Sequence, residues 1–191
     1  DLRTPLTRMK LQLAFIKDED ISKKLSDDIL EMEKMLNEYL QFSSSSSQEK
    51  TETFDLSKLI MSTVKKYEKK EININIPERV YLNGRKNLIQ RCINNLINNS
   101  IKYSKNIFIS LVKSENGITI NVDDDGPGIN KNERENVFKP FYKIDKSRSD
   151  SKSSVGLGLS IASDIVRSHG GNIKLETSPK NGLRAKIFLP C

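Results

Sequence analysis

A segment rich in amide side chains carries the first residues that could bind a ligand. Within residues 94–103, a helix would place four side chains on one face, at i, i+4, i+7 and i+8: Asn95, Asn99, Lys102 and Tyr103. The apolar residues between them would face elsewhere and could pack. Amide oxygens suit Mg²⁺, a hard cation that prefers oxygen ligands, and a Lys ammonium suits a phosphate. A solvated polar face is the alternative interpretation of this segment taken alone.

Two short glycine-containing segments could approach such a ligand closely. Residues 124–129 (Asp-Asp-Gly-Pro-Gly-Ile) follow an expected strand, and residues 156–159 (Gly-Leu-Gly-Leu) open an expected helix. Glycine lets the backbone come near a ligand, and a helix that begins on glycines offers free N–H groups to phosphate. Either segment alone could be an ordinary turn. Together with the amide-rich helix they favour a site for a phosphate-containing ligand.

The elements that must position these residues alternate between helical and strand patterns. This indicates a two-layer α/β sandwich with a mixed sheet over residues 52–191. Helices are expected at 56–67, 87–102 and 157–168, and strands at 72–76, 80–82, 107–112, 117–122, 173–177 and 185–189.

Residues 1–42 have a different pattern, with apolar residues at alternating spacings of four and three. A polar stretch at 17–20 interrupts this spacing, so we expect two helices joined by a short turn. One such hairpin cannot bury its apolar stripe alone, and pairing with a second copy into a four-helix bundle would solve this. Packing against the rest of its own chain is the alternative.

The two regions are separated by an unbroken serine run at 43–47. It has no apolar residue, so we expect a flexible linker at 43–51. The charge also changes sign here, from net −2 over residues 1–50 to net +9 over residues 51–191. We therefore place a domain boundary at this linker.

Composition excludes several classes of protein. The chain of 191 residues has one histidine, His169, and two distant cysteines, Cys92 and Cys191. This excludes a multi-histidine site, a cysteine-built zinc site and a disulfide scaffold. No run approaches the roughly 18 to 20 apolar residues of a membrane helix. The first residues, Asp-Leu-Arg-Thr-Pro-Leu, have the pattern of a helix interior, so we expect a portion of a longer protein.

The order of these motifs resembles the sensor histidine kinases of two-component systems. The amide helix, residues 124–128, Phe138-Lys-Pro-Phe-Tyr142 and residues 156–159 resemble the N, G1, F and G2 boxes of their ATP-binding domain. Residues 1–6 resemble the end of the phosphoacceptor box, with its histidine just before Asp1, and look most like the EnvZ-like osmosensor group. The resemblance implies an α+β protein, in which half of a dimeric four-helix bundle precedes a GHKL-type two-layer ATP-binding domain.

The resemblance also implies roles for individual residues. Asp124 would accept a hydrogen bond from the adenine amino group. Asn99, assisted by Asn95, would bind Mg²⁺, Lys102 would hold phosphate oxygens, and Tyr103 would border the nucleotide. The glycine segments would complete the ATP site with Gly126, Gly128 and Ile129 from one, and Gly156, Leu157, Gly158 and Leu159 from the other.

A lid over the nucleotide is implied at residues 143–155. Phe138 and Phe141 would anchor one end of it, Tyr142 belongs to the same box, and Lys143 and Arg148 would reach the γ-phosphate. On the hairpin, Asp1 would orient the attacking histidine, and Thr4 would orient a water during dephosphorylation of the partner regulator. His169, next to Gly170 and Gly171, is expected to be structural at a helix end.

The family implies a protein-histidine kinase that forms a homodimer and passes phosphate to the receiver domain of a response regulator. It would be the cytoplasmic portion of a bacterial inner-membrane protein, reaching the membrane only through upstream segments. Related ATPases and serine kinases resemble one another in a Glu four residues before the metal Asn, where this chain has Asn95. This argues against an ATP hydrolase. A nucleic-acid binder lacks any recognition motif here, and a non-catalytic ATP-binding signalling module remains an alternative.

Overall fold

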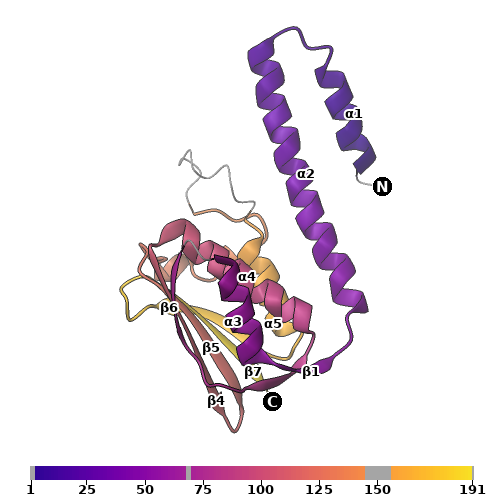
Figure 1. The fold of residues 1–191 in the computed structure, drawn as a ribbon. Coiled ribbons are helices and arrows are strands. Elements are labelled where there is room, and N and C mark those ends of the chain that lie inside the picture. Colours follow the sequence, from indigo (N-terminus) through magenta and orange to yellow (C-terminus); the bar gives the residue numbers. More distant parts are fainter. Residues whose placement is uncertain (1–2, 68–69, 145–155, 191) are drawn as a thin grey trace.

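The computed structural model describes residues 3–67, 70–144 and 156–190. Figure 1 shows a helical hairpin that extends away from an α/β unit containing the sheet. This arrangement confirms the expected α+β class, with a hairpin first and a two-layer sandwich after it.

The hairpin consists of α1 (Arg3–Leu13) and α2 (Glu19–Gln48). Asp18 begins α2 as its N-cap, since its carboxylate accepts a hydrogen bond of 3.0 Å from the Ile21 N–H. Leu6 and Ile29 are buried in the hairpin. Leu13, Ile16 and Leu36 are partly buried. Seven other large apolar side chains of the hairpin are more than a third exposed: Met9, Leu11, Phe15, Ile21, Leu25, Leu30 and Met32. Packing within the chain therefore leaves a large part of the hairpin's apolar surface uncovered.

The serine run departs from the sequence prediction. A flexible linker was expected at 43–51, but α2 includes the five serines and ends at Gln48. Each Ser that extends an existing helix costs only a few tenths of a kcal/mol relative to Ala, because nucleation has already occurred in the preceding turns. Only residues 49–51 separate α2 from the first strand of the α/β unit.

A five-stranded mixed sheet forms one layer of the α/β unit, in the order β2-β4-β5-β7-β6. Only β2 and β4 are parallel. The strands are β2 (Glu71–Asn75), β4 (Asn106–Ser114), β5 (Gly117–Asp124), β6 (Asn172–Thr177) and β7 (Leu183–Pro190). All five occur where the alternating pattern predicted strands.

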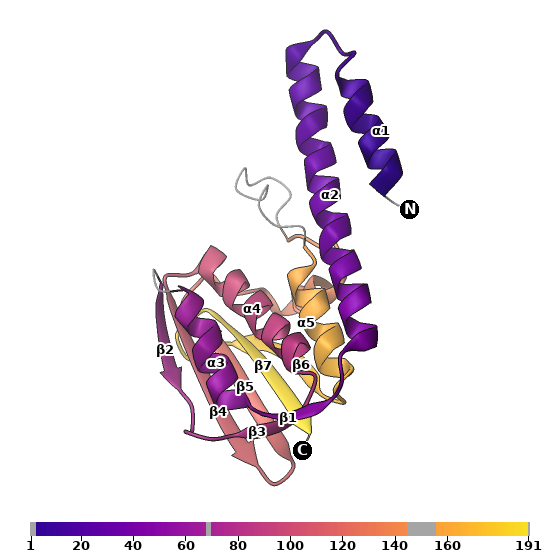
Figure 2. The ribbon, with the colours of Figure 1, turned by 45° about the vertical axis from the view of Figure 1, so that its right-hand side comes forward.

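Three helices form the second layer and lie across one face of the sheet (Figure 2). They are α3 (Leu56–Val64), α4 (Lys86–Tyr103) and α5 (Gly158–Arg167), each within two or three residues of its predicted position. Three short 3₁₀ turns occur at Lys65–Tyr67, Lys131–Glu133 and Asn136–Phe138. None of the described helices is both long and apolar enough to cross a bilayer.

A separate two-stranded ribbon joins β1 (Glu52–Asp55) to β3 (Tyr81–Gly84) in antiparallel pairing. The sequence predicted the second of these strands and missed the first. β1 is short, and its pairing depends on a partner far along the chain. Asp55 then caps α3, with its carboxylate 3.0 Å from the Lys58 N–H.

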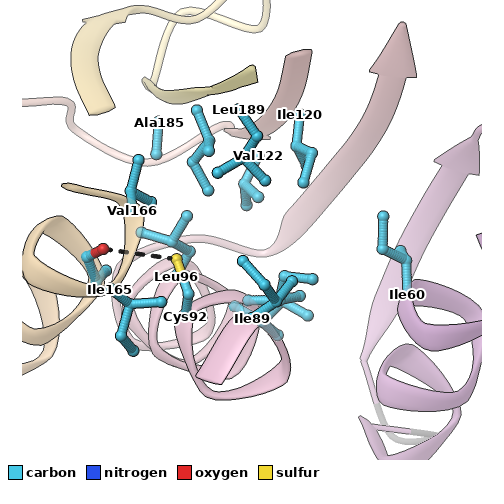
Figure 3. Close-up of a cluster of buried hydrophobic side chains, with 14 of the residues drawn as sticks. Ile60, Ile89, Cys92, Leu96, Ile120, Val122, Ile165, Val166, Ala185 and Leu189 are labelled. Carbon is cyan, nitrogen blue, oxygen red and sulfur yellow. Dashed lines mark hydrogen bonds between the residues drawn. The ribbon is translucent and has the colours of Figure 1, made fainter. Parts of the chain in front are cut away.

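The core lies between the helices and the sheet (Figure 3). Cys92 of α4 is buried there, and its thiol lies 3.8 Å from the Ala162 carbonyl oxygen of α5. Burial raises the pKa of the Cys92 thiol to about 12, so it behaves as a small apolar group. The close packing of α4 on α5 sets the position of the side chains on the next face of α4.

Candidate nucleotide site

The four asparagines within residues 94–99 of α4 divide between two sides of the helix. Tyr67 donates a hydrogen bond of 3.1 Å to Asn94 Oδ1, so Asn94 belongs to the side that faces α3. Asn95 and Asn99 are partly buried on another face. Lys102 lies further along that face, with Nζ 5.1 Å from the centre of the Tyr103 ring, and Tyr103 itself is about half exposed at 49%.

The start of α5 lies against this amide face. A Cβ added to Gly158 would lie 4.0 Å from Asn95 Cβ. The Nδ2 atom of Asn95 is buried and has no hydrogen-bond partner, although unpaired buried polar atoms are rare. The N-cap of α5, Leu157, makes no side-chain capping bond. An unpaired amide beside an uncapped helix start fits a site for phosphate groups and their metal ion.

Asp124 ends β5, and its buried carboxylate is only 3% exposed. Its Oδ1 accepts hydrogen bonds of 3.0 Å from the N–H groups of Gly126 and Leu183, and its Oδ2 accepts one of 3.2 Å from Ser100 Oγ. These donors come from the loop after β5, the start of β7, and α4. The carboxylate is therefore held from three sides at the point where the glycine loop begins.

Close backbone packing explains the glycines around this carboxylate. A Cβ on Gly126 would lie 2.8 Å from the Tyr103 carbonyl oxygen. A Cβ on Gly182 would lie 2.3 Å from the Asp124 carbonyl oxygen and 2.5 Å from its Oδ1. Gly128 has φ of 69°, a left-handed conformation that favours glycine. Side chains are thus excluded where the loop 124–128 meets α4 and β7.

Two further side chains hold the ends of this loop. Asp125 Oδ1 accepts hydrogen bonds of 3.0 Å from the N–H groups of Lys105 and Asn106, and these bonds, chiefly those from Asn106, lower the pKa of Asp125. Arg134 donates to the Ile129 carbonyl at 3.0 Å and to Thr177 Oγ1 at 2.9 Å. The loop is therefore fastened to the end of α4 and to β6.

The segment 138–144 meets the site at Gly156, and the two phenylalanines expected to anchor the lid differ in burial. Phe138 packs against the core, but the Phe141 side chain is 54% exposed. Phe141 instead donates a backbone hydrogen bond of 3.0 Å to the Gly156 carbonyl, with φ of 65°. Tyr142 also packs against the core and donates a hydrogen bond to Glu133. That bond raises the pKa of Tyr142.

The structure brings together most of the residues that the sequence predicted for the ATP site. Asn95, Asn99, Lys102, Asp124 and the described glycines lie on α4, on the loop after β5 and at the start of α5. Lys143 is described and partly buried, whereas Asp1, Arg148 and the proposed lid residues 145–155 lie outside the described residues. Thr4 lies in the first turn of α1, on the hairpin.

Three residues of the site were missed by the sequence reasoning: Ser100, Gly182 and Leu183. Ser100 is next to Asn99 and one helical turn after Leu96, a spacing that also fits a buried helix face. Leu183 is 59 residues from Asp124 and binds through its backbone, so its side chain gives no signal of this role.

Metal binding here would depend on amide groups. Among residues 3–67, 70–144 and 156–190, no group of three or more His, Cys, Asp or Glu side chains could hold a metal ion. The residues present fit Mg²⁺ bound through nucleotide phosphates, because the partly buried Asn95 and Asn99 offer neutral oxygen ligands next to the start of α5.

Comparison with known proteins agrees with this geometry. Residues 84–191 match the family described as histidine kinase-, DNA gyrase B-, and HSP90-like ATPase. The sensor histidine kinase CpxA of Escherichia coli (strain K12) is 32% identical over 204 residues, which cover 100% of this chain and 45% of CpxA. The sensor histidine kinase GtrS of Pseudomonas aeruginosa is 32% identical over 193 residues, covering 100% of this chain and 40% of GtrS. The chain thus spans less than half the length of these curated relatives.

Among solved structures, full-length ShkA in complex with AMPPNP is similar in fold. It has a TM-score of 0.70 and 17% identity, and the match covers 100% of this chain and 44% of that chain. The family match covers the ATP-site elements α4, β5 and α5, and the relatives align over the hairpin as well. The chain therefore belongs to the histidine kinase-, DNA gyrase B-, and HSP90-like ATPase family, and over its whole length it is similar to part of these sensor histidine kinases.

Proposed function

We propose that the loop after β5 recognises the adenine of ATP through Asp124. All the groups that contact its carboxylate donate hydrogen bonds, so the carboxylate acts only as an acceptor. Three contacts leave it acceptor capacity for one more donor, and the exocyclic amine of adenine supplies one. This triply held, buried carboxylate is the observation that carries the proposal.

The phosphate groups would lie between α4 and the start of α5. Asn99 and Asn95 would hold Mg²⁺, which neutralises phosphate charge when bound. Lys102 would bind phosphate oxygens, and the backbone N–H groups from Gly156 to Leu159 would donate to them. The unpaired Nδ2 of Asn95 supports this placement, because a ligand would give that amide a partner.

The reaction would be phosphoryl transfer to a histidine located immediately before Asp1. Transfer of this kind needs positioning and charge neutralisation more than covalent help from the protein. Lys143 and Arg148 would reach the γ-phosphate, and Asp1 would orient the histidine or take its other proton. The phosphate would then pass to an Asp of a response regulator. Thr4 would orient a water if the protein also removes that phosphate.

The hairpin would form a homodimer. The exposed apolar side chains of α1 and α2 support this, since a second hairpin packed against them would bury the stripe in a four-helix bundle. In the whole protein this part would be the cytoplasmic portion of a bacterial inner-membrane sensor, with residues 1–42 for dimerisation and 52–191 for catalysis.

The position of Asn95 argues against ATP hydrolysis as the main activity. An amide cannot act as a general base near neutral pH, so Asn95 cannot activate a water for attack on the γ-phosphate. A kinase whose acceptor and base lie on the hairpin does not need a base at that position.

The test uses two chains: the 191-residue chain and the same chain extended by a His immediately before Asp1. Both are expected to bind Mg-ATP, and only the extended chain is expected to take label from γ-labelled ATP, in an acid-labile and base-stable form. Binding without labelling in the extended chain would contradict the kinase assignment. Absence of binding in both would contradict the nucleotide site.

A further inference from the structure

Glu49 lies at the junction between α2 and the α/β unit, and its carboxylate binds two backbone amides of α4. Oε1 accepts a hydrogen bond of 2.6 Å from the Asn87 N–H, and Oε2 accepts one of 3.2 Å from the Leu88 N–H. The N-cap residue of α4, Arg85, makes no side-chain capping bond. α4 is therefore capped by a residue 38 positions earlier in the chain.

The cap is explained both by the free N–H groups at the start of α4 and by the position of Glu49 directly after α2. The first N–H groups of a helix have no partner within the helix, and a carboxylate is favourable near its positive end. Glu49 directly follows Gln48, the last residue of α2, and β1 begins three residues later at Glu52. One side chain thus ties the last turn of α2 to the first turn of α4.

The same end of α4 is also bound to the end of α5. The Arg85 N–H donates a hydrogen bond of 3.0 Å to His169 Nε2, and the Arg85 guanidinium donates one of 2.9 Å to the Ser168 carbonyl. At the opposite end of this helix pair, Gly158 lies beside Asn95. The two helices are antiparallel, so the Glu49 cap holds them at the end away from the proposed phosphate site.

We propose that Glu49 is a positioning residue for phosphoryl transfer, which fixes the ATP-binding unit relative to the hairpin through its cap on α4. This inference rests on the proposed kinase function. A hairpin that carries the acceptor histidine and a unit that carries ATP must meet in one geometry, and small misplacements of reacting groups slow transfer strongly. Through the Glu49 carboxylate, movement of α2 would reach the helix that holds Asn95 and Asn99.

The first test is amide hydrogen exchange in the 191-residue chain. Glu49→Ala should speed exchange at Asn87 and Leu88 and also in residues 43–48, by roughly fivefold, the effect expected for loss of a helix cap. The matched control is Glu52→Ala, which removes an exposed carboxylate three residues further along and should leave both regions unchanged. Faster exchange in α4 alone would mean a cap without coupling and would overturn the proposal, as would no change in either region.

The second test separates positioning from folding and from nucleotide binding. In the chain extended by a His before Asp1, Glu49→Ala should lower kcat for self-labelling by roughly tenfold or more and leave KM for ATP within about twofold. Glu49→Gln retains one acceptor oxygen and should recover part of the rate. If Glu49→Ala fails to fold, the rate of Glu49→Gln is compared with that of the parent instead. Equal kcat in a folded variant and its parent would overturn the inference, whereas a parent that never labels would contradict the kinase function itself.

Discussion

Ser100 and Asp124 are joined by a buried hydrogen bond of 3.2 Å that runs from α4 to the end of β5. Ser100→Ala removes one of three donors from a buried carboxylate, and loss of such a bond costs about 1–3 kcal/mol. We expect Mg-ATP affinity to fall by roughly five- to a hundredfold, measured by titration calorimetry. Ser62→Ala is the control, because Ser62 bonds only a carbonyl of its own helix α3. Equal affinities in the two variants would remove Ser100 from the site.

The paired asparagines of α4 offer a matched test of the metal site. Asn99→Ala should abolish the Mg²⁺-dependent part of nucleotide binding, because it removes an amide oxygen from the proposed ligand set. Asn98→Ala alters the exposed neighbour and should bind within about twofold of the parent. The measurement is ATP titration with Mg²⁺ and with EDTA. Unchanged Mg²⁺ dependence in Asn99→Ala would contradict the metal assignment.

Local pattern predicted most of the elements, because the apolar residues of α4 and the sheet strands repeat with the period of their own structure. It could not predict β1, whose partner strand lies nearly 30 residues away at Tyr81–Gly84. The serine run was predicted to be flexible from its composition alone. Composition does not show that the preceding helix can stabilise these serines in helical conformation.

The site shows the same limit. Asn95, Asn99 and Asp124 were predicted from side-chain type and the order of motifs. Leu183 and Glu49 act through contacts that only the folded chain creates, a backbone N–H that reaches across 59 residues and a carboxylate that reaches across 38. Roles that depend on residue type could be predicted from the sequence. Contacts between residues far apart in the chain could not.

A substitution at Gly182 would test the close packing around Asp124. Gly182→Ala would place a methyl group 2.3 Å from the Asp124 carbonyl oxygen and 2.6 Å from the Gly126 nitrogen, where neither backbone can move freely. We expect a loss of stability of about 1–3 kcal/mol or more and a weakened ATP site, measured by denaturant unfolding and calorimetry. Gly158→Ala is the folding control, because its nearest neighbour would be 4.0 Å away. A Gly182→Ala protein as stable as its parent would contradict this packing.

The partly buried His169 ring should make the free energy of unfolding depend on pH. Its Nδ1–H donates to the Ile165 carbonyl at 2.7 Å and its Nε2 accepts from Arg85, so the ring is neutral in the fold. Burial lowers the pKa of His169 below its usual 6.5. The unfolded chain therefore takes up a proton first as pH falls, and the free energy of unfolding should decrease from pH 6.5 downward until the folded pKa is reached.

The control for this prediction is simple, because His169 is the only histidine in the chain. Urea unfolding of the parent and of His169→Gln between pH 5.5 and 8 should show a slope in the parent that the variant loses. An identical slope in the two proteins would place the titrating group elsewhere.

The most direct test of the central claim compares Mg-ATP with Mg-GTP binding to the 191-residue chain by calorimetry. Asp124 offers an acceptor to the amine of adenine, whereas guanine has a carbonyl oxygen at that position. We predict one ATP per chain, bound at least about 100-fold more tightly than GTP, with the preference lost in Asp124→Asn. No ATP binding, or equal affinity for the two nucleotides, would contradict the account.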